Sequence, residues 1–216
     1  TDGSWAALST DELRQRRAAY ASRVATNIAQ ASNTLLQQWN DGFADEVRSA
    51  GSGSSVYGST QAGLDALFAS IFYVEKTVKD RKLAAPLGIS PDCASATCPN
   101  LLESQYANVS LLAVRSNLQA FVDIYDGGPD TATDRFGFGD LLRASNASQL
   151  ADDMQQALTL ASSRAPLVAE PMSGSLNTQT TRDLYDAVQG MTTLLKTQFV
   201  SVLNLRVPNE GAADND

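Results

Sequence analysis

Apolar residues recur through most of the chain at steps of three and four positions, the spacing that places side chains on one face of an α-helix. Long helices are therefore predicted over about residues 9–49, 64–78, 101–128, 150–166 and 180–202, with a short one over "DLLRA". Little of the chain alternates as a strand does. The pattern predicts an all-α fold, an up-and-down four-helix bundle with long helices and a short extra helix, in one domain over residues 1–216.

The first predicted helix has a clear starting signal. In "STDE", Ser9 can cap the helix, and Glu12, three residues later, can reach back to the Ser9 backbone. Its apolar positions are Tyr20, Val24, Ile28, Ala31, Leu35 and Trp39. After the break "GSGSSVYGS", the seam of a bundle helix is predicted at Leu64, Leu67, Ile71, Val74 and Val78, and the last helix has Leu184, Val188, Met191, Leu195 and Val202.

The third predicted helix, "LLESQYANVSLLAVRSNLQAFVDIYDGG", carries many short polar side chains for a packing helix. The ones of interest are Glu103, Ser104, Ser110 and Asn117. One explanation is structural: Asn100 caps the helix with Glu103 as its third residue, while the others face water or small-residue contacts. The other explanation is a binding site, and these residues by themselves leave both open.

The charge balance excludes some partners. The chain has 16 Lys and Arg residues against 24 Asp and Glu residues, which gives a net charge of -8 and a pI near 4.5. Nucleic acid and anionic membrane surfaces are therefore not expected as direct partners. No apolar run approaches the roughly 20 residues of a membrane-spanning helix, so no transmembrane segment is predicted in this chain.

Cys93 and Cys98 lie in the loop "SPDCASATCPN", at a spacing that can close a short disulfide-bonded ring. Zinc is a poor alternative, because the chain has no histidine and no second cysteine pair. A disulfide favours an oxidising compartment such as a periplasm, and so small a ring would stabilise the fold by roughly 2 kcal/mol. Two free, unreactive thiols are the alternative.

No catalytic residue can be assigned from the sequence. Without histidine, the chain cannot supply a Ser-His-Asp or Cys-His relay or a two-histidine zinc helix. Four aspartates at the end of the third predicted helix and in the loop after it, Asp123, Asp126, Asp130 and Asp134, lack the spacing and the terminal glutamate of an EF-hand loop. We interpret these aspartates as part of a solvated turn.

Four segments follow one another in a typical order: "LRQRRAAYASRVATNIAQASNTLLQQWNDGF", "KDRKLAAPLGI", "LLESQYANVSLLAVRSNLQAFVDIYDG" and "MTTLLKTQFVSVLNLRVPNEGAADND". Their motif positions are Arg17, Tyr20 and Trp39; Lys82, Pro86, Leu87 and Gly88; Glu103, Ser104, Ser110 and Asn117; and Leu195, Lys196 and Thr197. In order and spacing they resemble the C-terminal half of imelysin-like proteins. The resemblance covers nearly the whole chain.

The resemblance implies an exported bacterial protein, often a lipid-anchored lipoprotein, in the periplasm or at the outer-membrane surface of a Gram-negative cell. Such proteins have two helical-bundle domains and are frequently linked to iron-regulated expression or iron uptake. The family is classed with metallopeptidases, and its signature Gly-x-His-x-x-Glu lies in the N-terminal half, whereas this chain has no histidine. Either the chain is the C-terminal part of a longer protein, with the missing N-terminal domain as its partner, or it is a family member that has lost the motif. We favour the first, and in either case we do not expect this chain to be catalytic alone.

The resemblance also suggests a role for the polar residues of the third helix, which would line the cleft between the two domains. There Glu103 would be an oxygen ligand for iron or another divalent metal, or a hydrogen-bond acceptor, and Ser104, Ser110 and Asn117 would be ligand contacts. The predicted function is metal or ligand binding linked to iron acquisition, with this chain as one wall of the site. The alternatives are a metallopeptidase whose Gly-x-His-x-x-Glu lies in the missing half, and a non-catalytic helical interaction module.

Overall fold

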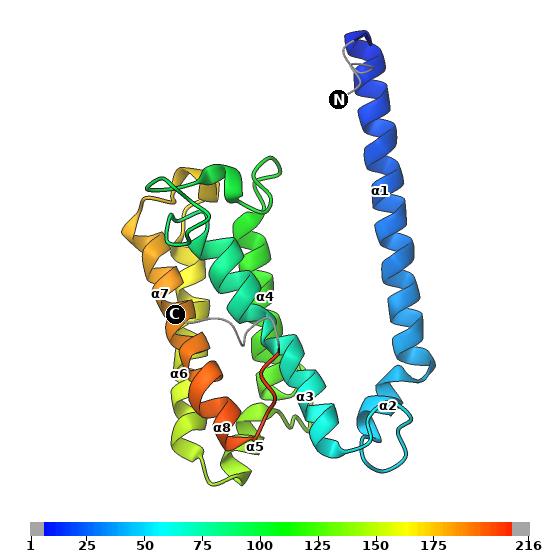
Figure 1. Ribbon diagram of the computed structural model, residues 1–216, viewed down its shortest axis with the longest axis vertical. Coiled ribbons are helices and arrows are strands. Elements are labelled where there is room, and N and C mark those ends of the chain that lie inside the picture. Colours follow the sequence, from blue (N-terminus) through cyan, green and yellow to red (C-terminus); the bar gives the residue numbers. More distant parts are fainter. Residues whose placement is uncertain (1–6, 209–216) are drawn as a thin grey trace. The chain divides into compact units, whose positions relative to one another are not determined.

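The computed structural model describes residues 7–208, and every regular element within this range is a helix (Figure 1). The all-α fold class predicted from the spacing of apolar residues is therefore confirmed. The chain divides into two compact units, with the boundary between Gly63 and Leu64. The interpretation of residues 1–216 as one domain stays a prediction, and the acidic end "NEGAADND" lies outside the described residues.

The first unit contains α1, Thr10–Gln38, which starts with the predicted capping box. The backbone N–H of Glu12 donates to Ser9 Oγ (3.3 Å), and the N–H of Ser9 donates to Glu12 Oε2 (2.9 Å). A π-helical turn, η1 (Trp39–Phe43), and the short α2, Ala44–Arg48, follow. Gly42 interrupts the predicted continuous helix, because its φ of 141° is a conformation open to glycine and strained for residues with a Cβ.

Among the described residues of the first unit, none buries the apolar face of α1. No residue of this helix is buried, and Tyr20, Ile28 and Leu35 are 70%, 61% and 68% exposed. A stripe of this kind on a surface helix usually faces another element. The spacing of apolar residues therefore predicted the helix correctly. Within the first unit, however, these apolar residues remain exposed.

The second unit is a bundle of long helices, coloured from cyan to red in Figure 1. Its long members are α3 (Thr60–Ile71), whose first four residues belong to the first unit, continued by the π-helix η2 (Val74–Ala84), then α4 (Ser110–Asp126), α6 (Ser148–Arg164), and α7 (Gln179–Leu194) continued by η6 (Leu195–Phe199) and α8 (Val200–Val202). The predicted short helix over "DLLRA" is α5, Phe138–Ala144, and single 3-10 turns η3, η4 and η5 occupy Pro99–Leu101, Ala165–Leu167 and Met172–Gly174. The predicted helical bundle is confirmed.

One apolar core holds these helices together. Fully or almost fully buried side chains come from every long helix: Phe68, Val78, Leu111, Val114, Leu118, Met154, Leu158, Leu184, Val188, Met191, Leu195 and Phe199. Each such side chain contributes about 1.5–3 kcal/mol by leaving water. Two predicted seam positions are wrong, since Leu67 and Val202 are 37% and 40% exposed.

The helix predicted to begin at Leu101 begins instead at Ser110. Leu102 is buried in the core with an extended backbone (ψ 129°), and a turn follows that ends with Asn108 in the left-handed conformation (φ 55°). An α-helix cannot run through either conformation. The predicted Asn100–Glu103 capping box is therefore wrong, because Glu103 lies in the turn before the helix.

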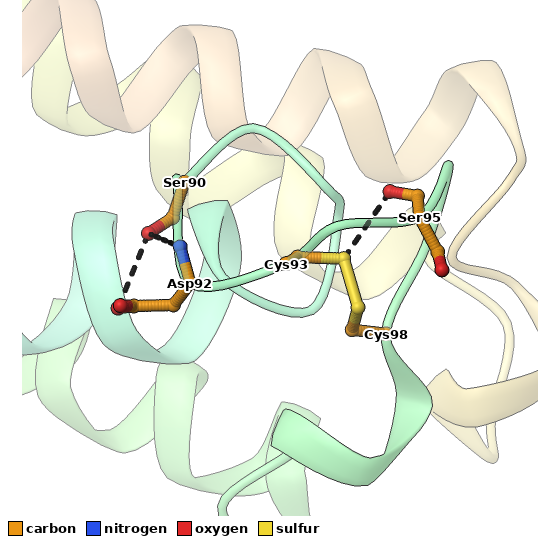
Figure 2. Close-up of a disulfide and its surroundings, with 5 residues drawn as sticks. All are labelled: Ser90, Asp92, Cys93, Ser95 and Cys98. Carbon is orange, nitrogen blue, oxygen red and sulfur yellow. Dashed lines mark hydrogen bonds between the residues drawn. A yellow bond between two sulfur atoms is a disulfide. The ribbon is translucent and has the colours of Figure 1, made fainter.

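The predicted disulfide between Cys93 and Cys98 is present, with an S–S distance of 2.05 Å, so the two free thiols are excluded (Figure 2). It closes the loop that follows η2. The N–H of Cys98 donates to the Pro86 carbonyl oxygen (2.8 Å). Gly88 has a φ of 74°, and a Cβ there would lie 2.5 Å from the carbonyl oxygen of Ala96. The loop therefore packs directly on the backbone at Gly88, where only glycine fits without strain.

Candidate functional site

Two of the polar residues singled out in the sequence, Glu103 and Asn117, contact one buried lysine. Lys82, near the end of η2, is 6% exposed, and its Nζ donates to Asn117 Oδ1 on α4 over 2.7 Å. The same Nζ lies 3.1 Å from Glu103 Oε2 in the turn before α4. It also lies 5.8 Å from the ring centroid of Tyr73, within the range of a cation–π contact. We call Lys82, Glu103 and Asn117 the lysine cluster.

The core positions the lysine cluster. Val78 on η2 and Leu118 on α4 are 0% and 1% exposed, so both helices are fixed by apolar packing beside the polar contact. Asn117 is the residue before Leu118 and points toward η2, where Lys82 supplies the donor that its amide oxygen needs. A buried polar atom without such a partner would cost about 1–3 kcal/mol.

Two of the predicted site residues make a contact of their own. The backbone N–H of Ser104 donates to Ser110 Oγ (3.2 Å), and Ser110 is 5% exposed at the first turn of α4. The Ser110 hydroxyl therefore holds the turn against the helix. Glu103, the neighbour of Ser104, keeps a side chain that is 47% exposed, so one carboxylate faces solvent beside the buried lysine.

The lysine cluster does not by itself form a metal site. Within residues 7–208, no group of three or more His, Cys, Asp or Glu side chains is arranged to hold a metal ion. Glu103 is a single carboxylate, and the nearby ammonium of Lys82 repels a cation. Iron or another divalent metal would need further ligands from outside this cluster. Among the described residues, the lysine cluster is therefore not a complete metal centre.

A second polar group, missed in the sequence, lies inside the bundle. Glu75 on η2 is 0% exposed, and its Oε1 is 2.8 Å from Lys79 Nζ and 2.8 Å from Lys196 Nζ. We call these three residues the ion network. Glu75 and Lys79 are four positions apart on one helix, which is a pairing signal, but Lys196 comes from η6 and only the fold brings it there.

The two lysines keep Glu75 charged. Burial raises the pKa of the Glu75 carboxyl, but hydrogen bonds from Lys196 and Lys79 outweigh this and hold the pKa below its ordinary value of 4.5. A buried charge survives only where it is paired and hydrogen-bonded. The ion network therefore links η2 to η6 across the core, and Lys196 belongs to the Leu-Lys-Thr segment quoted in the resemblance.

The fold and the lysine cluster define a class: an all-α helical-bundle protein with a buried lysine that presents a carboxylate at the bundle surface. A family model for imelysin matches residues 3–198, and the chain belongs to the imelysin family. The resemblance of the four sequence segments is confirmed. No curated protein and no solved structure matches the chain. No helix among the described residues is long and apolar enough to cross a membrane.

Proposed function

We propose that this chain acts in an exported bacterial protein that binds a metal or polar ligand in iron acquisition. In this proposal the lysine cluster is one wall of the binding site, and Glu103 is the group that meets the ligand. The observation that carries the proposal is the Glu103 carboxylate, half exposed to solvent yet held 3.1 Å from the buried ammonium of Lys82.

The physical argument is preorganisation. A flexible surface glutamate loses rotamer freedom when it binds a ligand, which weakens binding by about 0.5–1.5 kcal/mol. Lys82 is itself fixed by Asn117 and by burial, so its contact with Glu103 restricts the carboxylate before any ligand arrives. The disulfide favours an oxidising compartment such as the periplasm.

A metal bound here would share its ligands with another part of the protein. We propose the missing N-terminal domain as that part, since the family signature Gly-x-His-x-x-Glu offers a histidine and a second carboxylate. Those groups would offset the repulsion between the metal and Lys82. In the metallopeptidase alternative, the hydrolytic groups also belong to that domain, and this chain contributes the wall.

The interaction-module alternative is favoured by a different observation, the exposed apolar stripe of α1. Tyr20, Ile28 and Leu35 are each more than half exposed, so a partner helix could bury them. This alternative predicts that no metal binds and that substitution of Ile28 and Leu35 by serine removes the partner interaction. Analytical ultracentrifugation of this chain mixed with the N-terminal half measures that interaction.

The test of the proposed site is calorimetric titration of iron and of zinc into this chain and into a longer protein that includes the N-terminal half. Each protein is also measured as Glu103→Ala and as the matched control Glu170→Ala. Glu170 has the same exposure, 47%, and also pairs with a cation, Arg115, at 3.4 Å. We expect metal binding by the longer protein that weakens about tenfold or more in Glu103→Ala and is unchanged in Glu170→Ala.

Equal binding by the wild-type and Glu103→Ala proteins would place the metal elsewhere and contradict the proposed wall. No binding of either metal by the longer protein would remove the metal from the proposal and favour the interaction module.

A further inference from the structure

A surface pocket lies beside η2, and none of its lining residues comes from α4. It is a pocket of about 780 Å³ between η2, the start of the disulfide loop and α7. Its polar lining includes Asp80 and Arg81 of η2, Ser90 and Asp92 of the loop, and Tyr185 and Gln189 of α7. The volume lies in the range of pockets that take small organic ligands, about 300–1,000 Å³.

The charges around the pocket favour an anion. Asp80 is already paired, with Lys76 Nζ at 3.3 Å and Lys79 Nζ at 3.2 Å. Arg81 has no hydrogen bond or ion pair with any residue of the described part of the chain, so its guanidinium is available. The chain carries a net charge of -8, and a free cation in a hollow of such a protein is a local exception.

The buried ion network strengthens this local charge. Lys79, which pairs with the lining residue Asp80, also contacts Glu75, and Lys196 contacts the same carboxylate. The cationic groups in and around the pocket are Lys76, Lys79, Arg81 and Lys196. They outnumber the carboxylates, which are Glu75, Asp80 and Asp92. Interior charges act at lower effective dielectric than charges in water, which extends their influence to the pocket.

The neutral side chains of the lining, and the loop that forms one wall, are held in place. The amide Nε2 of Gln189 donates to the Tyr185 hydroxyl oxygen over 3.2 Å. The loop wall at Ser90 and Asp92 is anchored by the Cys93–Cys98 disulfide next to it, and Ser90 Oγ accepts from the N–H of Asp92 (Figure 2). A pocket with fixed walls loses less conformational entropy on binding.

The backbone beside the pocket is also unusual. The N–H of Ala85 donates to the carbonyl oxygen of Asp80 over 2.8 Å, a bond across five positions that is typical of a π-helix. Such segments are rare and are frequently found at functional sites. The geometry of η2 sends Lys82 toward α4 and presents Asp80 and Arg81 to the pocket, so the two sites use different faces of one helix.

We propose that this pocket binds a small organic carboxylate, with the Arg81 guanidinium as its charged contact and Gln189 and Tyr185 as its neutral contacts. The planar guanidinium matches a carboxylate with two parallel hydrogen bonds. The hydroxyl and carboxylate oxygens of Ser90 and Asp92 accept hydrogen bonds, so a carboxylate that also carries donor groups suits the lining. This site does not rest on the proposed role of Glu103.

The test is an NMR titration of the full chain with succinate, malate and L-glutamate, and separately with inorganic phosphate. We expect saturable shifts of backbone signals in residues 76–92 and 185–189 with at least one carboxylate at millimolar concentration. Arg81→Gln should weaken that binding about tenfold or more, because it removes a charge-assisted contact. The control Arg182→Gln, also on a helix of this unit but outside the pocket lining, should bind as the wild type does.

A second variant, with both Cys93 and Cys98 replaced by alanine, frees the loop wall without touching Arg81. It should fold and bind the same carboxylate more weakly. The proposal is overturned if no carboxylate gives saturable shifts, if Arg81→Gln binds as tightly as the wild type, or if phosphate binds more tightly than every carboxylate.

Discussion

Lys82 Nζ and Asn117 Oδ1 lie 2.7 Å apart, although the two residues are 35 positions apart in the sequence. This contact joins η2 to α4 at the place where Glu103 also approaches. Because Lys82 is buried and the hydrogen bond is partly buried, the contact contributes to stability as well as to the geometry of the site. The two roles can be separated by experiment.

Lys82→Met keeps the length of the side chain and removes its charge. The Asn117 amide loses its donor and Glu103 loses its partner, so the free energy of unfolding should fall by about 1–3 kcal/mol. Urea unfolding measures this loss. Lys76→Met, which removes a partly exposed lysine paired with Asp80, should change stability little. A similar loss in both variants would contradict a special role for Lys82.

Glu75→Gln tests the ion network. The substitution leaves Lys79 and Lys196 in the core without their shared charge, and breaking a buried pair in this way costs about 3–5 kcal/mol. Thermal unfolding followed by circular dichroism would show the loss as a lower midpoint. Asp45→Asn breaks the exposed pair with Arg48 in the first unit and should leave the midpoint almost unchanged.

The lowered pKa of Glu75 predicts that the stability of the fold decreases at acidic pH. The pKa of Glu75 is lower in the folded chain than its ordinary value of 4.5, since the hydrogen bonds from the lysines outweigh burial. Its contribution is therefore complete above pH 4.5 and is lost as the pH falls through the folded pKa. Between pH 6 and pH 3, the free energy of unfolding should fall less steeply with decreasing pH in Glu75→Gln than in the wild type. Equal slopes would show that Glu75 is not responsible.

Tyr125 predicts a loss of stability in alkali. Burial raises the pKa of its phenol from 10.0 to about 12, and the hydroxyl donates to the Ala151 carbonyl oxygen over 2.9 Å. The unfolded chain ionises at the lower pKa, so this contribution is complete below pH 10 and lost as the pH rises through 12. The loss amounts to about 2–3 kcal/mol. Tyr125→Phe should be less sensitive to pH over this window in urea unfolding.

Gly88→Ala tests the close packing of the disulfide loop. The new Cβ would strain a backbone with a φ of 74° and meet the Ala96 carbonyl oxygen, so a loss of about 1–3 kcal/mol is expected. Gly190→Ala makes the same chemical change on the exposed side of α7, where nothing lies within 4 Å, and should stabilise by about 0.5–1 kcal/mol. Opposite signs in chemical denaturation would support the packing argument, and equal signs would contradict it.

Features governed by neighbouring residues could be predicted from the sequence. The capping box of Ser9 and Glu12 depends on three positions of separation, and the Cys93–Cys98 disulfide depends on a short loop. The apolar spacing of α6 and α7 likewise predicted their buried faces. In each case the interaction that decides the structure lies within a few turns of the chain.

Features decided by distant residues were not predictable in the same way. The start of α4 shifted because Leu102 is buried in a core built by other helices, which the segment itself does not encode. The sequence identified Glu103 and Asn117 as candidate site residues. It did not identify Lys82 as their common partner, because Lys82 belongs to a separate sequence motif. For Glu75, a charged residue between Val74 and Lys76, the sequence gave no sign of full burial.

The shared oxygen of Glu75 also has an evolutionary consequence. Because one atom receives Lys79 and Lys196, loss of the Glu75 carboxylate removes the charge that both lysines share, whereas loss of either lysine leaves one ion pair with Glu75. Lineages that change Glu75 should therefore also change the two lysines. In an alignment of homologous sequences, this would appear as covariation between a position on η2 and one on η6, with apolar triplets as the permitted replacement.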